Sequence, residues 1–158
     1  MVIRVANNVS VVQGHGVRIV RLGPTSAAEA RRTFALMAET FGEERGDLSD
    51  GYLDALLARP DLWALAAIDG DDVVGGLTAH TLPMTRSETA EIFLYDLAVR
   101  PDRQRQGIGR LLVEALREET AAAGINEIFV PADDDDAHAI DFYRALGGSP
   151  SPVTMFDL

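Results

Sequence analysis

The order of apolar and polar positions predicts the elements in the first part of the chain. The apolar segment 17–22 is typical of a buried strand, and Pro-Thr-Ser at 24–26 favours the start of a helix. An Ala-rich stretch continues this helix to about residue 40, and segment 50–58 is typical of a second, short helix. The sequence therefore predicts a strand followed by two helices.

The pattern then changes to the period of strands. Segments 62–68, 73–82 and 91–99 are apolar or alternate between apolar and polar residues, and Asp-Gly-Asp-Asp at 69–72 is a turn signal. We expect three consecutive antiparallel strands here.

The second half of the chain predicts two more helices. The first, over 105–123, ends at Gly124, and its apolar residues recur at helical spacing: Ile108, Leu111, Leu112, Ala115 and Leu116. A short strand over 127–130, a helix over 136–146 and a last strand over 153–156 follow. This order predicts an α/β fold with a mixed, mostly antiparallel, twisted sheet flanked by helices.

The length of 158 residues fits a single domain. Residues 1–16 contain Gly14 and Gly16 and show little periodicity. We predict that they form a loosely attached N-terminal extension, or reflect an early start codon, ahead of a domain at 17–158.

Composition removes several kinds of chemistry. The chain has no cysteine and no lysine, which excludes disulfides, thiolate ligands, a cysteine nucleophile, a lysine base and a Walker-type phosphate lysine. His15, His80 and His138 share no metal-ligand spacing, so we assign no metal site.

The charge balance indicates the kind of partner. Fourteen basic against 25 acidic residues give a net charge of -11, which disfavours nucleic acid and anionic membranes and favours a cationic partner. No apolar run approaches the roughly 20 residues of a membrane span, and residues 1–16 lack the features of a secretory signal. We expect a cytoplasmic protein.

Segment 97–109 has the layout of an anion-binding site. A buried strand runs into a loop with Gly107 and Gly109 and then into a long helix, whose first N–H groups and positive dipole end suit a phosphate. The densest basic cluster flanks it, at Arg103, Arg105 and Arg110. The alternative is an ordinary helix N-terminus with solvated arginines.

The pattern Gln104-x-x-Gly107-x-Gly109 after a strand ending Leu97-Ala98-Val99 resembles the acetyl-CoA signature of the GNAT superfamily of N-acetyltransferases. The predicted order of elements matches that fold from residue 17 onward. A closer likeness is to the aminoglycoside 3-N-acetyltransferase (gentamicin-type) branch. It rests on segments 21–24, 91–99, 105–108, 132–133, 146–147 and 155–157, together with Tyr143.

The resemblance implies acetyl transfer from acetyl-CoA to the 3-amino group of an aminoglycoside's 2-deoxystreptamine ring. The donor would be held by Leu97, Ala98, Val99, Gln104, Arg105, Gln106, Gly107, Ile108, Gly109 and Arg110. Relatives of this kind are usually dimers, so a homodimer is expected.

Acidic residues are the candidates for binding a polycationic acceptor. The run 133–136 would attract ammonium groups; Asp133 and Asp136 match acidic positions of the family, and Asp134 and Asp135 are carried over with them. Glu91 and Tyr95 are further candidates. The alternative for Asp136 is a helix cap.

Without cysteine, the amine must attack the thioester directly, and a carboxylate must take its proton. Asp96 is the first candidate base, because an ionised carboxylate within the apolar run 92–99 is costly to bury without a purpose. Strand alternation places Asp96 opposite Tyr95 and Leu97, unless a bulge changes the parity. The alternatives are a structural aspartate, a contact to a substrate ammonium, or Glu91 as the base.

Tyr143 corresponds to the tyrosine that often protonates the departing CoA thiolate in the superfamily. Its spacing from Ile140 and Leu146 also suits plain packing on a helix. Two wider alternatives stay open. The acceptor could be a polyamine, another amino sugar or a protein N-terminus, or the chain could bind acyl-CoA or antibiotic without turnover.

Overall fold

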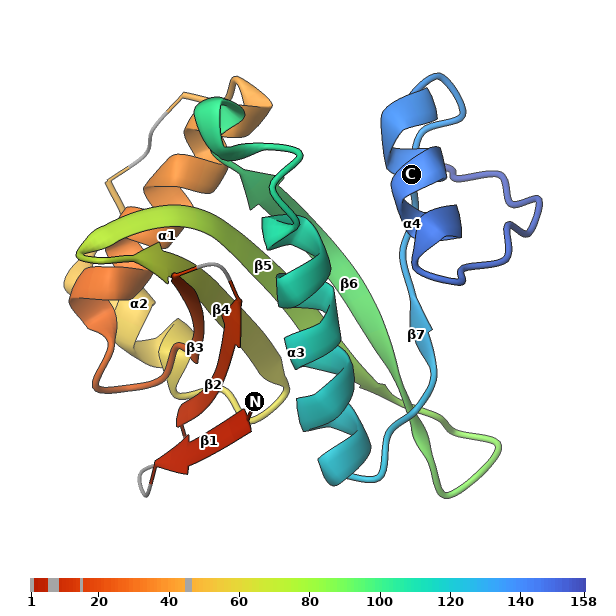
Figure 1. The fold of residues 1–158 in the computed structure, drawn as a ribbon. Helices are drawn as coiled ribbons and strands as arrows, with labels where there is room; N and C mark the ends of the chain where they lie inside the picture. Colours follow the sequence, from red (N-terminus) through yellow and green to blue (C-terminus); the bar gives the residue numbers. More distant parts are fainter. Residues whose placement is uncertain (1, 6–8, 15, 45–46) are drawn as a thin grey trace.

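The computed structural model describes residues 2–5, 9–14, 16–44 and 47–158, and the strands in these ranges form one sheet (Figure 1). The seven strands lie side by side in chain order: β1 (Val2–Val5), β2 (Val9–Gly14), β3 (Val17–Arg21), β4 (Leu62–Asp69), β5 (Asp72–Pro83), β6 (Ala90–Val99) and β7 (Ile128–Phe129). Neighbouring strands are antiparallel except β6 and β7, which are parallel. The predicted mixed, mostly antiparallel sheet is confirmed.

Helices cover both faces of this sheet (Figure 1). They are α1 (Ala27–Phe41), α2 (Asp50–Leu57), α3 (Ile108–Ala122) and α4 (Ala137–Ala145). One core lies under α1 and α2 and includes Leu53 and Ala64, and a second core lies under α3 and includes Leu77 and Leu112. We call the two sides of the sheet the α1 face and the α3 face. Within the described ranges, no helix is both long and apolar enough to cross a membrane.

Helix α3 begins three residues later than the sequence pattern predicts. Pro101–Arg103 form a single 3-10 turn after β6, and Arg105 and Gly107 then take positive φ angles of 58° and 83°. A right-handed helix cannot include residues in that conformation. The chain therefore makes a compact loop before it enters α3 at Ile108.

The described backbone of residues 1–16 forms two strands, which the sequence pattern did not predict. Strand β2 pairs with β3, with Gly14 opposite Val17, and β1 pairs with β2. The edge of β3 has backbone N–H and C=O groups that need hydrogen-bond partners. A neighbouring strand can supply these partners even if its own side chains do not alternate between apolar and polar. The domain boundary at residue 17 stays a prediction, but the segment extends the sheet.

The strand predicted over 153–156 is not formed. Residues 148–158 have no regular structure, and Val153 and Phe156 are about four-fifths exposed, at 81% and 78%. Alternating apolar residues make a strand only beside a partner, and the neighbouring β7 is itself only two residues long. Residues 153–156 therefore do not pair with another strand in this structure.

A β-bulge interrupts the pairing of β5 with β6. Thr78 lies opposite Asp96 while Ala79 lies opposite Leu94, so Tyr95 is an extra residue on β6. A bulge of this kind reverses which side chains face each side of the sheet. Tyr95 is therefore the position at which the side-chain parity of β6 changes.

Candidate functional site

The loop between β6 and α3 presents the backbone groups expected of an anion site. Gly107 is the N-cap residue and has no side chain to accept a hydrogen bond from the first turn of α3. The N–H groups of Ile108, Gly109 and Arg110 also lack a carbonyl four residues earlier within the helix. On the strand side, the Gln104 side chain donates to the Val99 carbonyl oxygen at 3.1 Å. The helix dipole and these N–H groups together favour a bound anion.

The three arginines that flank this loop differ in what they contact. Arg103 forms an ion pair with Asp69 at 2.7 Å, and Arg110 donates to the Ala145 carbonyl oxygen at 3.3 Å. Arg105 is exposed and forms no ion pair within the described part of the chain. Arg105 is therefore the best placed of the three to meet a phosphate.

Asp96 lies on the α1 face of the sheet because of the bulge. Its partner Thr78 and the next-but-one residue His80 point to the same side of β5, and His80 lies opposite Phe93. Asp96 thus shares a face with Phe93 rather than with Leu94, which is buried under α3. Plain alternation alone would have placed Asp96 on the α3 face.

The environment of Asp96 weakens its acidity. Burial raises the pKa of the Asp96 carboxyl above its ordinary value, and the hydrogen bond donated by Thr78 Oγ1 to Oδ2 at 3.3 Å opposes this only in part. Glu43, just beyond α1, raises the pKa further by like charge, whereas His80 lowers it. A carboxylate with a raised pKa is a stronger base, so the chemistry supports proton acceptance.

Aromatic rings line the α1 face beside Asp96. We call them the aromatic wall: His80, Phe93, Tyr95 and Phe129. The Tyr95 ring meets His80 and Phe93 edge-on at 5.8 and 5.6 Å between centroids, and Phe93 stacks on Phe129 at 5.2 Å. Tyr95 and Phe129 are 61% and 46% exposed, so the wall faces solvent. Such a surface suits a cation or the apolar face of a sugar ring.

Sequence reasoning placed only Tyr95 of these rings in the site. His80, Phe93, Phe129 and the nearby Glu43 were missed, because their proximity depends on the register of β5, β6 and β7 and on where α1 ends. One signal was available in the sequence: Thr78 and His80 are two residues apart on one predicted strand, so both point to the same side of the sheet.

Glu91 is on the same face but far from Asp96. It pairs with Leu82, four residues along β5 from the Thr78 partner of Asp96. At the rise of a strand this separates them by about 13 Å. The structure does not bring the two candidate bases together.

Tyr143 lies on the other side of the sheet. It packs on the α3-face core, next to Phe142 at 5.1 Å between ring centroids. A Cβ placed on Gly109 would lie 3.3 Å from the Phe142 ring, so α4 approaches the start of α3 closely. Burial, followed by the charge of Asp136, raises the pKa of Tyr143 to about 12. The phenol thus keeps its proton at neutral pH, and the neighbouring Phe142 ring lies at the start of α3.

The acidic run 133–136 is exposed and precedes α4. Asp136 caps this helix, because its Oδ1 accepts a hydrogen bond from the Ala139 N–H at 2.9 Å. Asp133 holds the turn through its carbonyl oxygen, which accepts from the Asp136 N–H at 3.0 Å. The carboxylates of Asp133, Asp134 and Asp135 stay available to solvent.

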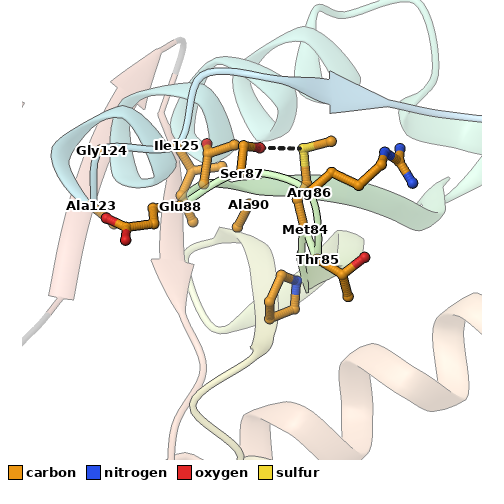
Figure 2. Close-up of a pocket in the computed structure, with 11 residues that line it drawn as sticks. Met84, Thr85, Arg86, Ser87, Glu88, Ala90, Ala123, Gly124 and Ile125 are labelled. Atoms are coloured by element: carbon orange, nitrogen blue, oxygen red, sulfur yellow. Dashed lines mark hydrogen bonds between the residues drawn. The ribbon is translucent and has the colours of Figure 1, made fainter.

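A hollow of about 780 Å³ lies away from these groups (Figure 2). It is lined by the β5–β6 connection at 83–90 and by 123–125 after α3, and by none of the predicted site residues. A helix as long as α3 separates this end from the anion-binding loop by about 20 Å. Among the residues described, no group of three or more acidic or histidine side chains is arranged to hold a metal.

The fold and this site define a class of protein. The model of the acetyltransferase (GNAT) family matches residues 30–147, a range that includes the Gly-containing loop between β6 and α3. The chain belongs to this family. Acetyltransferases of this family use acetyl-CoA as the acetyl donor.

Known proteins of three kinds are similar to the chain. An aminoglycoside acetyltransferase from an uncultured soil metagenomic sample, meta-AAC0020, solved in complex with sisomicin, shares 30% identity and a TM-score of 0.85, covering 90% of this chain and 95% of that one. A ribosomal protein bS18-alanine N-acetyltransferase of Salmonella typhimurium is 39% identical over 108 residues, 68% of this chain and 62% of the relative. A mycothiol acetyltransferase of Clavibacter michiganensis is 32% identical over 130 residues, 78% of this chain. The match spans 40% of that relative's length.

Proposed function

We propose that this acetyltransferase acts on an amine of a small polycationic molecule, and that the acceptor is the 3-amino group of the 2-deoxystreptamine ring of an aminoglycoside. The observation that carries the proposal is Asp96, a half-buried carboxylate of raised pKa beside an exposed aromatic wall. The likeness to meta-AAC0020 over nearly its whole length supports the same acceptor class.

The donor side rests on the loop between β6 and α3. The N–H groups of Ile108, Gly109 and Arg110 and the free Arg105 guanidinium suit the diphosphate of acetyl-CoA. Gly107 keeps the approach to these groups open. Beside them, Leu97, Ala98 and Val99 at the end of β6 would align the acetyl-pantetheine arm, and Gln104 and Gln106 shape the loop.

The acceptor side rests on the α1 face. Tyr95 and the rest of the aromatic wall would hold a sugar ring or an ammonium group, and Asp96 would face the reacting amine. Glu91, about 13 Å away along the strand, would bind a second ammonium group. Asp133, Asp134 and Asp136 add negative charge, although Asp136 is already engaged as a cap.

In the chemical step, Asp96 takes a proton from the acceptor ammonium, directly or through a water molecule. The free amine then forms a C–N bond with the acetyl carbonyl carbon as the C–S bond breaks, and the electron pair leaves on the CoA sulfur. The amine nitrogen then loses its second proton to solvent, because Asp96 already holds the first one.

Tyr143 stabilises the leaving group. A phenol with a pKa near 12 holds its proton at neutral pH and is a weaker acid than a thiol, whose pKa is about 8.5. Its O–H is therefore suited to donating a hydrogen bond to the developing thiolate, with the final proton coming from solvent. This role is more limited than the full protonation implied by the family resemblance.

A protein N-terminus is the second candidate acceptor. It is supported by the 39% identity to the bS18-alanine N-acetyltransferase, which covers 68% of this chain. An extended peptide would bring one ammonium group, whereas an aminoglycoside brings several. The acceptor with several charges fits the acidic α1 face and the exposed acidic run better.

Release of CoA thiol from acetyl-CoA tests the proposal. Gentamicin, sisomicin, kanamycin, spermidine and a peptide beginning with alanine are compared at equal concentration, and the acetyl group on any product is located by NMR. Turnover on gentamicin with a 3-acetamido product is expected. Turnover on the peptide or spermidine alone would overturn the acceptor assignment, and thiol release from none would favour a binding module.

We further propose that the chain forms a homodimer, as expected from the family resemblance. Val153, Met155 and Phe156 of the C-terminal tail are exposed apolar residues that a second subunit would cover. Sedimentation equilibrium should give twice the monomer mass of 17.0 kDa. The monomer mass at all concentrations would contradict it.

A further inference from the structure

A group of side chains joins the anion-binding loop to the turn between β4 and β5. We call it the loop clamp: Asp69, Arg103 and Gln106. Arg103 Nη1 lies 2.7 Å from Asp69 Oδ2, and Arg103 Nε donates to Gln106 Oε1 at 3.1 Å. Gln106 Nε2 in turn donates to the Asp102 carbonyl oxygen at 3.3 Å. One guanidinium thus connects the turn to the loop.

The loop has an unfavourable backbone that needs such support. Arg105 has a φ of 58°, a left-handed conformation that costs a residue with a side chain about 1 kcal/mol or more. Gly107, two residues later, is also left-handed at 83°. Gln106 lies between them, so a fixed Gln106 side chain restrains both turns of the backbone.

The turn that carries Asp69 is itself held in place. Arg32 of α1 donates to the Asp71 carbonyl oxygen at 2.8 Å, and the Arg100 N–H donates to the Val74 carbonyl oxygen at 2.9 Å. Asp69 is thus a firm point of attachment. The Arg103 side chain that reaches it is only 21% exposed.

The charge of Asp69 raises the pKa of Arg100, behind the larger effect of the Arg100 hydrogen bond to Asp102, but its direct ion pair is with Arg103. The Arg103 side chain links Asp69 directly to the anion-binding loop. A carboxylate this close to the proposed diphosphate site repels the ligand. Its pairing with Asp72 in the strand ladder uses backbone groups, which any residue supplies. A direct interaction with Arg103 explains why a carboxylate is useful there.

We propose that Asp69 and Arg103 are positioning residues for donor binding: Asp69 orients the Arg103 guanidinium, which fixes Gln106 and holds the loop N–H groups ready for the diphosphate of acetyl-CoA. Arg103 then acts through the loop rather than as a phosphate ligand. The inference rests on the donor site of the proposed function and is independent of which amine is the acceptor.

Two explanations for the Asp69 carboxylate predict opposite changes in the Kd for CoA when it is replaced. If the carboxylate acted only through its charge, Asp69→Asn would remove repulsion and tighten CoA binding. If it positions the loop, Asp69→Asn weakens CoA binding, by about fivefold for a partly exposed ion pair. The Kd for CoA is measured by isothermal titration calorimetry on the full chain. The turnover number at saturating acetyl-CoA should change less than twofold, because the reacting groups are untouched.

Three further variants locate the effect. Asp69→Glu keeps the carboxylate and should recover most of the affinity. In an Arg103→Met background, Asp69→Asn should weaken binding no further, since the clamp is already broken. Asp61→Asn is the matched control, because Asp61 lies just before β4, at its opposite end, and pairs with Arg59 at 2.6 Å; its Kd should equal that of the parent chain.

An unchanged or tighter Kd in Asp69→Asn, with an unchanged melting temperature, would overturn the loop clamp. An equal loss in the Arg103→Met background would overturn the route through Arg103. Failure of the unmodified chain to bind CoA would overturn the proposed donor site and the clamp with it. Binding of CoA without turnover of any amine would contradict only the acceptor assignment.

Discussion

Single residues on β6 and α4 control the proposed chemistry. Asp96 and Tyr143 both have raised pKa values, and burial is the main cause for each. The effects differ, because a raised pKa makes the Asp96 carboxylate a better base, while Tyr143 stays neutral and suits hydrogen-bond donation. Burial therefore supports two different proposed roles, one for a residue on β6 and one for a residue on α4.

Asp96→Asn should lower the turnover number by about a hundredfold, since a positioned general base contributes 10²–10⁴. In the parent chain, activity should rise with pH through the raised pKa of Asp96, and this acidic limb should vanish in the variant. A pH profile of kcat measures both. Activity within threefold of the parent would exclude Asp96 as the base.

The same variant should not reduce stability at neutral pH. Because the folded-state pKa of Asp96 is raised, its contribution is favourable below the unfolded value and is lost as pH rises through the folded value. Asp96→Asn should therefore melt at an equal or higher temperature at pH 7, with the difference shrinking toward pH 4. Thermal unfolding at several pH values checks this. A clearly lower melting temperature at pH 7 would show that the carboxylate is structural.

Tyr143→Phe keeps the packing and removes the O–H. We expect the turnover number to fall about tenfold, as for loss of one hydrogen bond to a charged group, with little change in the Kd for CoA. The control is Phe142, whose ring contacts the anion-binding loop side of α3. Phe142→Leu should lower the stability of the fold and change the turnover number less than Tyr143→Phe does. If Tyr143→Phe and the parent chain have equal turnover numbers, the phenol takes no part in the chemical step.

At the scale of elements, helix α1 packs closely on strand β5, on the face of the sheet that carries Asp96. A Cβ on Gly76 would lie 2.4 Å from Thr33 Cγ2 and 3.0 Å from Met37 Sδ. A glycine is required there because the helix sits directly on the strand. The approach sets how far α1 covers the sheet and leaves the aromatic wall open beyond it.

Gly76→Ala should therefore destabilise the fold by about 1–3 kcal/mol through overpacking. Gly51 in α2 is the matched control, since a Cβ there meets no atom within 4 Å. Gly51→Ala should stabilise by about 0.5–1 kcal/mol through helix propensity. Chemical denaturation of both variants measures these opposite signs, and equal stabilities would contradict the close packing of α1.

For the whole molecule, the net charge of -11 shapes the encounter with substrate. An acidic surface attracts a polycationic acceptor at long range, and salt screens this attraction beyond a Debye length of about 10 Å at 0.1 M. The positively charged loop for the donor is local, and Arg105 is exposed on it.

Raising NaCl from about 20 to 300 mM should lower kcat/KM for gentamicin about fivefold, and should lower it less for an acceptor with one amine. Replacing Asp133, Asp134 and Asp135 by Asn should reduce this salt dependence while leaving the cap at Asp136 intact. Initial rates at subsaturating acceptor measure the slope. An identical slope in the triple variant would show that the acidic run does not contribute.

The patterns of apolar residues were enough to predict most elements, because hydrophobic periodicity and turn residues act locally. The β4–β5 turn and the amphipathic α3 could be located this way, although the pattern placed the start of α3 three residues too early. Local pattern could not predict β1 and β2, which depend on the open edge of β3. It also predicted a strand at 153–156 that has no ladder partner in the structure.

The sequence by itself determined the αβ order, the Gly-containing loop before a helix, the absence of thiol and lysine chemistry, and the acidic charge. Only the tertiary structure decided that a bulge at Tyr95 turns Asp96 toward His80 and the aromatic wall, and that Arg103 pairs with Asp69. The reason is physical: residue type and local period are properties of neighbours along the chain. Strand register and ion pairs between distant turns depend on how separate segments pack.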